Sequence, residues 1–549
     1  MYFREKKTKY ASYLQLVESR RVDGKPRQKV ILTLGKIDES GQALKTLDSI
    51  LLSGAKFSEK LAVLADHRMA EVPECRRMID GPNKVFEKLW KSTGIQDTLL
   101  YLLKNRQFEF DVERAIFIAV LHRIMKPGSD LSCESWRRNQ NIPGNSDLEL
   151  HHFYRAMAWL GDMIDEFNDS DPFSPRYRTH QIEELVFQTQ RDLFSGIGMV
   201  FFDTTSLYFE GKGGEALGEY GFSKDRKPDR HQMVVGVVID DRGNPLCMEM
   251  WPGSTTDVST LLPVVHRLKS RFGVKSMCVV CDRGMISRDN LDALEEEGIH
   301  YIIGTRMRKN TQVKDRVLCS PGRYQTVRSA RTKSSDPAPL KVKNVQVDET
   351  RYVVCLNEEE AHAEKAKREV ILESLREKLR RGSRQLIGNK GYRRYLKKLE
   401  GVFEIDEDKI REEERYDGKY VLQTTLSLPA SEIALRYKDL YRVERVMRQI
   451  KDVLSTRPVY HQNAHSIRGH VFCSFLALKL IHALEVKLKE NTSDLCFEQL
   501  KDELNEVYTS EVKIGKKRFA IRSEIEPHAA ESIRAVGAKF DPKIVQLNQ

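Results

Sequence analysis

The stretch Gly198-Met-Val-Phe-Phe-Asp203-Thr-Thr-Ser-Leu-Tyr-Phe-Glu210 decides the fold of this chain. It is typical of a strand buried on both faces, because apolar residues fill both alternating positions up to Phe202. A carboxylate in that setting is costly unless it is paired or binds a metal. The pattern recurs in Met277-Cys-Val-Val-Cys-Asp282. Two strands that each deliver an aspartate could hold a divalent cation, or each aspartate could simply cap a strand or begin a turn.

Length and composition favour a large protein with a polyanionic partner. A chain of 549 residues predicts three or four domains, and its net charge of +11 indicates nucleic acid as the partner. Nine scattered cysteines argue against a secreted disulfide framework. Cys278 and Cys281 form a C-x-x-C, but they lie inside an apolar strand with no second pair nearby, so we interpret them as core residues.

Neither a signal peptide nor a membrane span is expected. The sequence begins with polar and basic residues and has no apolar signal region, and its most apolar helix, 471–484, contains Lys479 and His482. We therefore predict a cytoplasmic, nucleoid-associated protein with no membrane partner.

The first 40 residues form a basic β-hairpin region. Residues 1–36 contain ten Lys or Arg and three acids, and Ser12–Ser19 and Lys29–Leu34 alternate as strands do. Asp23-Gly24 suits the turn between them. Such a hairpin could lie along a phosphate backbone, or it could be a solvated edge hairpin.

Residues 41–195 are predicted to be an α-helical DNA-binding and dimerisation region. Apolar residues recur there at helical spacing, and Pro127-Gly128 ends the clearest helix. The predicted helices are 59–66, 84–92, 96–105, 111–125, 129–138, 149–167 and 180–194.

From residue 196 the period changes to that of a mixed α/β sheet flanked by helices. Strands are expected at 198–209, 231–240, 245–251, 276–281 and 301–304, with helices at 257–272 and 287–298. The loop 221–230 holds four basic residues, Lys224 and Arg230 among them, which suits phosphate binding.

A β-rich insertion is expected at 305–436. Its predicted strands are 341–347, 351–356, 401–405 and 419–426, with a charged helix at 358–381. Residues 437–490 should complete the sheet domain, and 491–549 form a tail region that the pattern does not resolve.

A third carboxylate, Glu444, lies on an amphipathic helix predicted from Ser431 to Leu454. Seven residues are close to two helical turns, so Tyr437, Glu444 and Lys451 should project along one face, with Arg448 near them. An acid flanked by cations suits a metal ligand beside a phosphodiester; the alternative is an ordinary Glu444–Arg448 pair.

Together, Asp203, Asp282 and Glu444 match a two-metal site for phosphoryl transfer. Two Mg²⁺ or Mn²⁺ ions about 3.5–4 Å apart would activate a water or a 3′-hydroxyl and stabilise the leaving oxygen. Carboxylate oxygens suit these ions better than Zn²⁺.

The chain resembles the DDE transposases of bacterial insertion sequences, and among them the insertion-sequence-four superfamily. That family carries the helix signature Y-x2-R-x3-E-x6-K, which Tyr437, Glu444 and Lys451 match in spacing. The arginine position is Leu440 here, a departure that Arg442 or Arg445 would have to offset. The segments 221–225, 281–285 and 457–461 also look like this family.

The resemblance implies an RNase H-like catalytic domain with a β-rich insertion, and a homodimer acting on double-stranded DNA. It implies cleavage at terminal inverted repeats and joining of the 3′-hydroxyls to target DNA. Asp203, Asp282 and Glu444 would be the catalytic metal ligands. The residues expected to contact DNA are Tyr437, Lys451, Arg448, Arg445, Lys224, Arg230, Arg283, Arg457 and His461.

Two other functions remain open at this point. An RNase H-like endonuclease would cut without joining, and an inactive relic would bind DNA without cutting. The large insertion and the Tyr–Glu–Lys spacing favour the transposase over the first, and the presence of all three acids favours it over the second.

Overall fold

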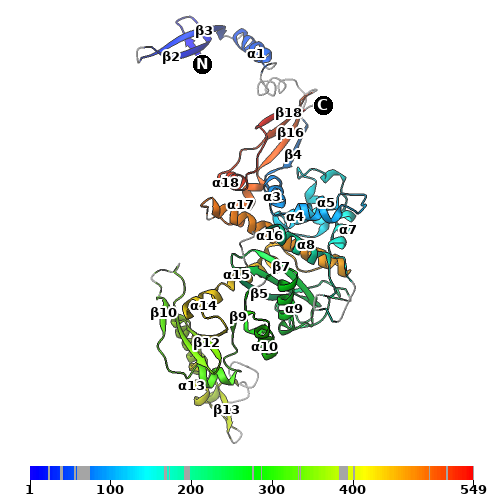
Figure 1. Ribbon diagram of the computed structural model, residues 1–549. Helices are drawn as coiled ribbons and strands as arrows, with labels where there is room; N and C mark the ends of the chain where they lie inside the picture. The colour runs from blue at the N-terminus through cyan, green and yellow to red at the C-terminus, as the bar shows by residue number, and fades with distance from the viewer. Residues whose placement is uncertain are drawn as a thin grey trace. The chain divides into compact units, whose positions relative to one another are not determined.

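The computed structural model describes the chain from Met1 onward with short gaps (Figure 1). The residues left undescribed are 23–24, 38–40, 55–56, 58–73, 166–169, 172–173, 191–197, 215, 275–276, 286, 330, 332, 334–335, 382–392, 400–401, 494, 515–516 and 548–549. The described chain divides into two compact units. One comprises 1–89, 135–146 and 484–549; the other comprises 90–134 and 147–483.

A mixed sheet forms the centre of the second unit. The strands that the apolar runs predict are present as β5 (Met199–Tyr208), β6 (Gln232–Asp240), β7 (Pro245–Pro252), β8 (Cys278–Cys281) and β9 (His300–Gly304). β5, β6 and β7 are antiparallel neighbours, whereas β8 runs parallel to both β5 and β9. The resulting order, β9-β8-β5-β6-β7, is consistent with an RNase H-like transposase.

α9 (Asp257–Ser270) and α10 (Arg288–Glu296) pack against this sheet. They follow β7 and β8, and their buried Leu261, Val265 and Leu294 join the apolar core that includes Val200 and Phe202. Ser287 caps α10 by accepting a bond of 3.1 Å from the backbone N–H of Asn290, as its position before the helix predicts.

The β-rich insertion extends this sheet. β15 (Lys419–Thr424) pairs antiparallel with β9, and β12 (Thr350–Leu356), β11 (Leu340–Val347) and β10 (Gln325–Arg328) follow outward, which makes nine strands among the described residues. The predicted strands 341–347, 351–356 and 419–426 are thus present. The remaining elements are η3 (Val313–Val317), α11 (Glu358–Arg381), β13 (Leu396–Leu399), β14 (Val402–Ile405) and α13 (Glu407–Glu414).

The prediction of one continuous helix from Ser431 to Leu454 is wrong, because the helix is interrupted. It consists of α14 (Ala430–Lys438), α15 (Tyr441–Arg448) and a π-helical turn, η5 (Gln449–Val453). At the break the N–H of Leu440 bonds to the carbonyl of Tyr437, three residues back, in place of the α-helical i−4 bond. The apolar stripe survives: Leu440, Val443, Met447, Ile450 and Leu454 are all buried.

Helices dominate the region before β5. α1 was not predicted; the other described helices agree with the predicted ones to within about a turn, except that α7 ends at Leu160 and not at 167. They are α1 (Gln42–Gly54), α3 (Gly81–Ser92), α4 (Ile95–Leu103), α5 (Val112–Met125), α6 (Asp130–Arg137), α7 (Leu150–Leu160) and α8 (Arg178–Gln190). Every residue of α5 is buried. The predicted helix 59–66 lies outside the described residues.

The first unit contains two small sheets. The predicted hairpin is present as β2 (Ser12–Val22) and β3 (Lys25–Ile37), and β1 (Tyr2–Lys7) adds a third strand that was not predicted. The second sheet has the order β18-β17-β16-β4. Its strands are β4 (Glu74–Ile79), β16 (Tyr508–Ile514), β17 (Lys517–Arg522) and β18 (Ile544–Leu547).

Residues 41–195 are therefore not entirely helical. β4 lies within them and pairs with β16 from the C-terminal region. The C-terminal region also contributes α17 (Phe497–Asn505) and α18 (Pro527–Ala535), which follow α16 (Ala464–Glu490), the long apolar helix that was predicted to begin only at Val471.

No helix among the described residues combines the length and the apolar character needed to cross a membrane.

Candidate active site

Asp203 is the fifth residue of β5, the strand between β6 and β8. Its side chain is half-buried and accepts a bond of 2.7 Å from the N–H of Thr204. Burial, together with the nearby charges of Asp282 and Asp257, raises the pKa of Asp203 to about 6, although the Lys224 ammonium opposes the shift. The strand thus holds a carboxylate whose negative charge is poorly compensated.

Asp282 lies beside Asp203 because of strand register. In the parallel pair β5–β8, Phe202 is opposite Cys281, and each aspartate is the next residue of its strand or of the turn that follows. Asp282 is exposed, and its Oδ1 lies 3.4 Å from the phenolic oxygen of Tyr437. Two carboxylates therefore meet at one end of the sheet, as the two apolar runs predict.

Glu444 reaches this region on α15, which packs against β5 and β6 through its buried face. The Glu444 side chain is exposed, whereas Tyr437 on α14 is turned toward the sheet. Burial and the Asp282 charge raise the pKa of Tyr437 well above its usual range, so the phenol keeps its proton and can donate it in a hydrogen bond. The buried Leu440 occupies the family's arginine position as part of the core.

A fourth carboxylate, Asp257, belongs to the same region and was not predicted. Its Oδ1 accepts a 2.5 Å bond from the Thr204 hydroxyl, and its Oδ2 lies 3.2 Å from Lys224 Nζ. A Cβ added to Gly284, two residues after Asp282, would lie 3.4 Å from that Oδ2. In the sequence Asp257 is only an acid in the first turn of a helix, which the helix dipole explains without any site.

The donor set fits a hard divalent cation. Asp203, Asp282 and Glu444 offer only carboxylate oxygens, which suit Mg²⁺ or Mn²⁺, and the raised pKa of Asp203 marks a place where a cation would relieve repulsion. The oxygens of all three do not lie within 4.8 Å of one another: in the described chain only Asp130, His461 and His470 bring three ligand atoms that close. As arranged, the three carboxylates do not converge on one point.

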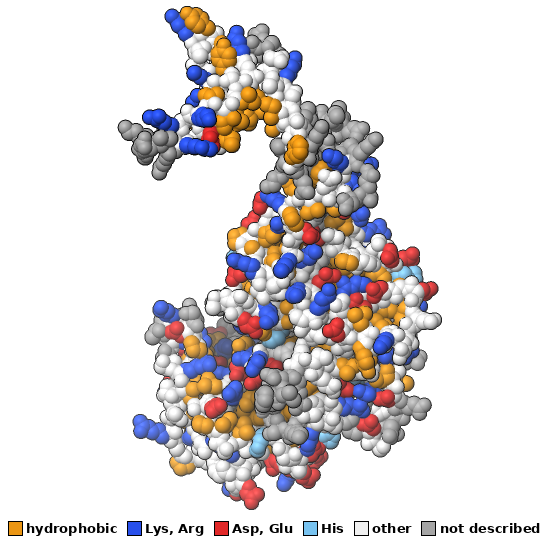
Figure 2. All heavy atoms as spheres, turned by 45° about the horizontal axis from the view of Figure 1, so that its top comes forward, with side chains coloured by type: hydrophobic (Ala, Val, Ile, Leu, Met, Phe, Trp, Pro, Cys, Tyr) orange, Lys and Arg blue, Asp and Glu red, His pale blue; other side chains and the backbone are white. Residues whose placement is uncertain are grey.

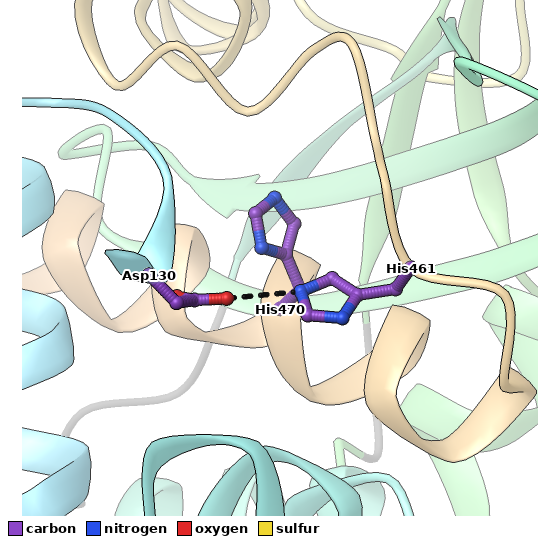
Figure 3. Close-up of side chains that lie close together, drawn as sticks. All are labelled: Asp130, His461 and His470. Carbon is purple, nitrogen blue, oxygen red and sulfur yellow. Dashed lines mark ion pairs between the residues drawn. The ribbon is translucent and has the colours of Figure 1, made fainter. Parts of the chain in front are cut away.

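The Asp130–His461–His470 cluster (Figure 3) does not fit a metal, because the guanidinium of Arg123 already contacts His470 and Asp130. His461 Nε2 is 3.1 Å from Asp130, and Arg123 Nη2 is 2.9 Å from His470 Nδ1 and 3.7 Å from Asp130. Burial and the Arg123 charge lower the pKa of His470 to about 3, so it is neutral. Although burial opposes it, the bond from His461 and the charge of Arg123 lower the pKa of Asp130 to about 2.

The structure separates the predicted DNA-contacting residues other than Tyr437 into four groups, of which three lie near the carboxylates or are exposed. Lys224 bonds to Thr204 and Asp257 beside the carboxylates. Arg283 lines a hollow of about 290 Å³ with Arg306, Met307, Arg308 and Lys309, which makes it strongly basic. Arg445 and Arg448 are exposed on α15, the helix of Glu444.

The remaining predicted contacts are held by acids of the protein. Lys451 and Arg457 both pair with Asp225, and Arg230 bonds to Glu210 at 2.6 Å. His461 is 13% exposed and pairs with Asp130, which makes it part of the packing between α6 and the segment before α16. Figure 2 shows Lys and Arg side chains mixed with acidic ones over the visible face, not gathered in one patch.

These features define a class. A mixed sheet with two aspartates at the ends of adjacent parallel strands, and a glutamate on a helix packed against it, is the framework of a metal-dependent enzyme of phosphoryl transfer.

The comparisons give the family. Residues 195–480, just over half of the chain, match the family model described as "Transposase DDE domain", and residues 3–66 match "IS1634 family transposase, N-terminal domain". The chain belongs to the DDE transposases of insertion sequences, which confirms the resemblance seen in the sequence. Such transposases bind DNA and use divalent metal ions. No curated protein matches the chain.

Proposed function

We propose that this transposase binds the terminal inverted repeats of its element as a homodimer, cuts phosphodiesters at the element ends and joins the 3′-hydroxyls to target DNA. Asp203, Asp282 and Glu444 would hold two Mg²⁺ or Mn²⁺ ions. One observation supports this most strongly: β5 and β8 present Asp203 and Asp282 at the same end of the sheet, and α15, which carries Glu444, packs on β5.

The chain's own residues have distinct parts in this proposal. When bound, the divalent ions would lower the pKa of the attacking water or hydroxyl and stabilise the leaving oxygen. Asp203 would bind the ions as a carboxylate, so at pH values below about 6 it would release its proton as the site fills. Tyr437 keeps Asp282 oriented through its phenol, and Lys224 offsets part of the carboxylate charge before a cation binds.

DNA would follow the exposed cations near these acids. The basic hollow of Arg283, Arg306, Arg308 and Lys309 adjoins Asp282, and Arg445 and Arg448 extend from the Glu444 helix. All six side chains are exposed, which favours contact with phosphates, although Arg308 pairs with the buried Glu413. Recognition of the repeat would fall to the N-terminal hairpin and the helical region of 41–195.

The test is Mg²⁺- or Mn²⁺-dependent cleavage of the element's own end DNA. We expect the wild type to nick the ends, and Asp203→Asn, Asp282→Asn and Glu444→Gln each to bind the ends without cutting. Asp229→Asn is the matched control, because Asp229 is a 78% exposed acid of the loop before β6. Cutting by any of the three variants at the wild-type rate would remove that residue from the site.

Joining is tested with a target plasmid in the same reaction. Strand-transfer products are expected from the wild type; cleavage without them would make the protein an endonuclease, and binding without cleavage an inactive relic. Deleting residues 1–54, which contain β1–β3 and α1, should abolish specific end binding while cation-dependent nicking of nonspecific DNA remains.

A further inference from the structure

Two adjacent residues of the loop between β5 and β6, Lys224 and Asp225, contact two different segments of the chain. Lys224 contacts the strand that carries Asp203, and Asp225 contacts the segment that follows Glu444. The two side chains carry opposite charges. The Lys224 ammonium lies beside the carboxylate of Asp257, and the Asp225 carboxylate lies beside the cations Lys451 and Arg457.

The Lys224 contact is made of three bonds. Its Nζ donates to the Thr204 carbonyl and to the Thr204 hydroxyl, both at 2.7 Å, and lies 3.2 Å from Asp257 Oδ2. The backbone N–H of Lys224 also donates to the Ser206 hydroxyl at 3.0 Å. The loop is therefore fixed along β5 on both sides of Thr205, directly after Asp203.

The Asp225 contact is a buried ion triad. One oxygen, Oδ1, lies 2.8 Å from Lys451 Nζ and also pairs with Arg457. The Asp225 side chain is 8% exposed, and those of Lys451 and Arg457 are 12% and 21% exposed. Asp225 Oδ2 is also buried and has no hydrogen-bond partner among the described residues, so both of its bonds to cations depend on a single atom.

Burial makes these pairs costly to break. Removing one partner of a buried ion pair leaves an uncompensated buried charge and is strongly destabilising, whereas exposed pairs contribute little. The exposed Arg230–Glu210 pair at the other end of the loop, at 41% and 47% exposure, belongs to the weak kind. Asp225 therefore makes the buried charged contact between this loop and the segment that follows Glu444.

We propose that Lys224 and Asp225 form a two-sided clamp that fixes the Glu444-bearing segment against β5, and that Asp225 is a positioning residue of the active site. Lys451 lies in η5, immediately after α15, so a contact at Lys451 restrains the C-terminal end of the Glu444 helix. This inference rests on the proposed function, because it assumes that Glu444 and Asp203 serve one metal site.

The test compares Asp225→Asn with wild type in Mn²⁺ binding by calorimetry, without DNA, and in end cleavage under single-turnover conditions. Groups that hold metal ligands in place contribute about 10- to 100-fold to metal affinity or activity, so we expect Asp225→Asn to lose about 10-fold in each. Asp225→Glu, which keeps the charge, should recover most of the loss. Asp229→Asn should bind and cleave as wild type does.

A second measurement separates positioning from competition with DNA. If Asp225 merely occupied Lys451 and Arg457 until phosphates displaced it, Asp225→Asn would bind end DNA more tightly, and the salt dependence of binding would steepen by about 0.9 per added phosphate contact. The clamp predicts unchanged or weaker binding with an unchanged slope; tighter binding with a steeper slope would overturn it.

The outcomes also separate this proposal from the previous one. If wild type neither binds Mn²⁺ nor cuts DNA, the proposed function fails. If wild type does both and folded Asp225→Asn matches it in both, the function stands and the clamp falls. Circular dichroism confirms that each variant is folded, and a loss of stability alone, with Mn²⁺ affinity retained, also counts against the clamp.

Discussion

Gly304, the last residue of β9, lies directly beneath the phenol of Tyr437: a Cβ at this position would be 2.5 Å from the phenolic oxygen and 3.2 Å from the ring carbon that bears it. The Tyr437 ring can occupy this position only because residue 304 is a glycine and has no Cβ. From that place its hydroxyl reaches Asp282 at 3.4 Å. A glycine at the end of a strand thus controls how Tyr437 meets Asp282, a carboxylate of the proposed active site.

Replacing Gly304 by alanine should displace Tyr437 and slow cleavage. The phenol is attached to a rigid ring and cannot move away alone, and overpacking of this kind costs about 1–3 kcal/mol. A displacement near 1 Å at a reacting centre can cost about 100-fold in rate. We therefore expect the cleavage rate of Gly304→Ala to be lower than that of Tyr437→Phe and higher than that of Asp282→Asn. Single-turnover cleavage rates test this order. Gly304→Ala with the wild-type rate would show that the site tolerates the shift.

Substituting Asp203 by asparagine should stabilise the metal-free protein at neutral pH. The folded pKa of about 6 exceeds the unfolded value of 3.8, so the folded state binds more protons between these values and loses stability as pH rises through them. Ionised Asp203 then costs up to about 3 kcal/mol above pH 6, which asparagine avoids while keeping an oxygen for the Thr204 N–H.

The measurement is the urea midpoint in EDTA at pH 7.5 and at pH 4. Asp203→Asn should be more stable than wild type at the higher pH and nearly equal at the lower one. Added Mn²⁺ should raise the midpoint of the wild type but not of the variant. Equal midpoints for both proteins in EDTA at pH 7.5 would show that Asp203 is not held in a poorly compensated site.

The sequence predicts an element well where its local pattern of apolar residues also reflects its burial in the fold. The runs ending at Asp203 and Asp282 predict β5 and β8, since a strand buried on both faces needs a continuous apolar run. The break at Leu440 escapes prediction because the apolar stripe of Val443 and Met447 continues across it unchanged. Periodicity reports which face is buried, not whether the helix is continuous.

The features that the sequence did not predict depend on contacts between segments that are far apart in the chain. Asp225 lies in a polar, basic loop that is typical of solvent exposure, and only the tertiary fold brings Lys451 and Arg457 to it. β4, with its sequence Glu-Cys-Arg-Arg-Met-Ile, has little strand character of its own and owes its conformation to β16. Asp257 fits a helix N-terminus equally well with or without a site.

Substituting Arg267 by methionine should be strongly destabilising. Arg267 is 2% exposed on α9, and its guanidinium donates to Glu183 at 2.7 Å and to Glu249 at 2.5 Å. Burial raises the pKa of Glu183 to about 8, and the arginine opposes that shift. Methionine keeps much of the volume but removes the cation of Glu183 and leaves Glu249 with His180 alone, which costs about 3–5 kcal/mol.

Lys269→Met is the matched control on the same helix, because Lys269 is 39% exposed and pairs with Glu297 at 3.2 Å. An exposed pair of this kind contributes about 0–1 kcal/mol. Urea unfolding of the two variants should therefore differ by at least about 2 kcal/mol. Equal effects would mean that the buried acids take up protons at no cost and that Arg267 does not stabilise the contact of α8 with β7 and α9.

Substituting Gly81 by alanine should separate the C-terminal strands from β4. Gly81 begins α3, its N–H donates to the Val507 carbonyl at 2.9 Å, and a Cβ there would press on the Leu504 carbonyl and lie 2.8 Å from Val507 Cβ. The obstacle is backbone, which cannot turn aside as a flexible side chain can. The β4–β16 pairing beside it, with Arg77 stacked 3.7 Å over the ring of Tyr508, should therefore loosen.

Hydrogen exchange of the β4 and β16 amides tests this. Gly198→Ala serves as control, since a Cβ at Gly198 meets nothing within 4 Å. Faster exchange in both strands of Gly81→Ala, at unchanged protection of β5, would show that the residues after 490 fold as one unit with residues 74–81. Unchanged protection would mean that Leu504 and Val507 can retreat, and that the pairing of β4 with β16 does not depend on the close approach at Gly81.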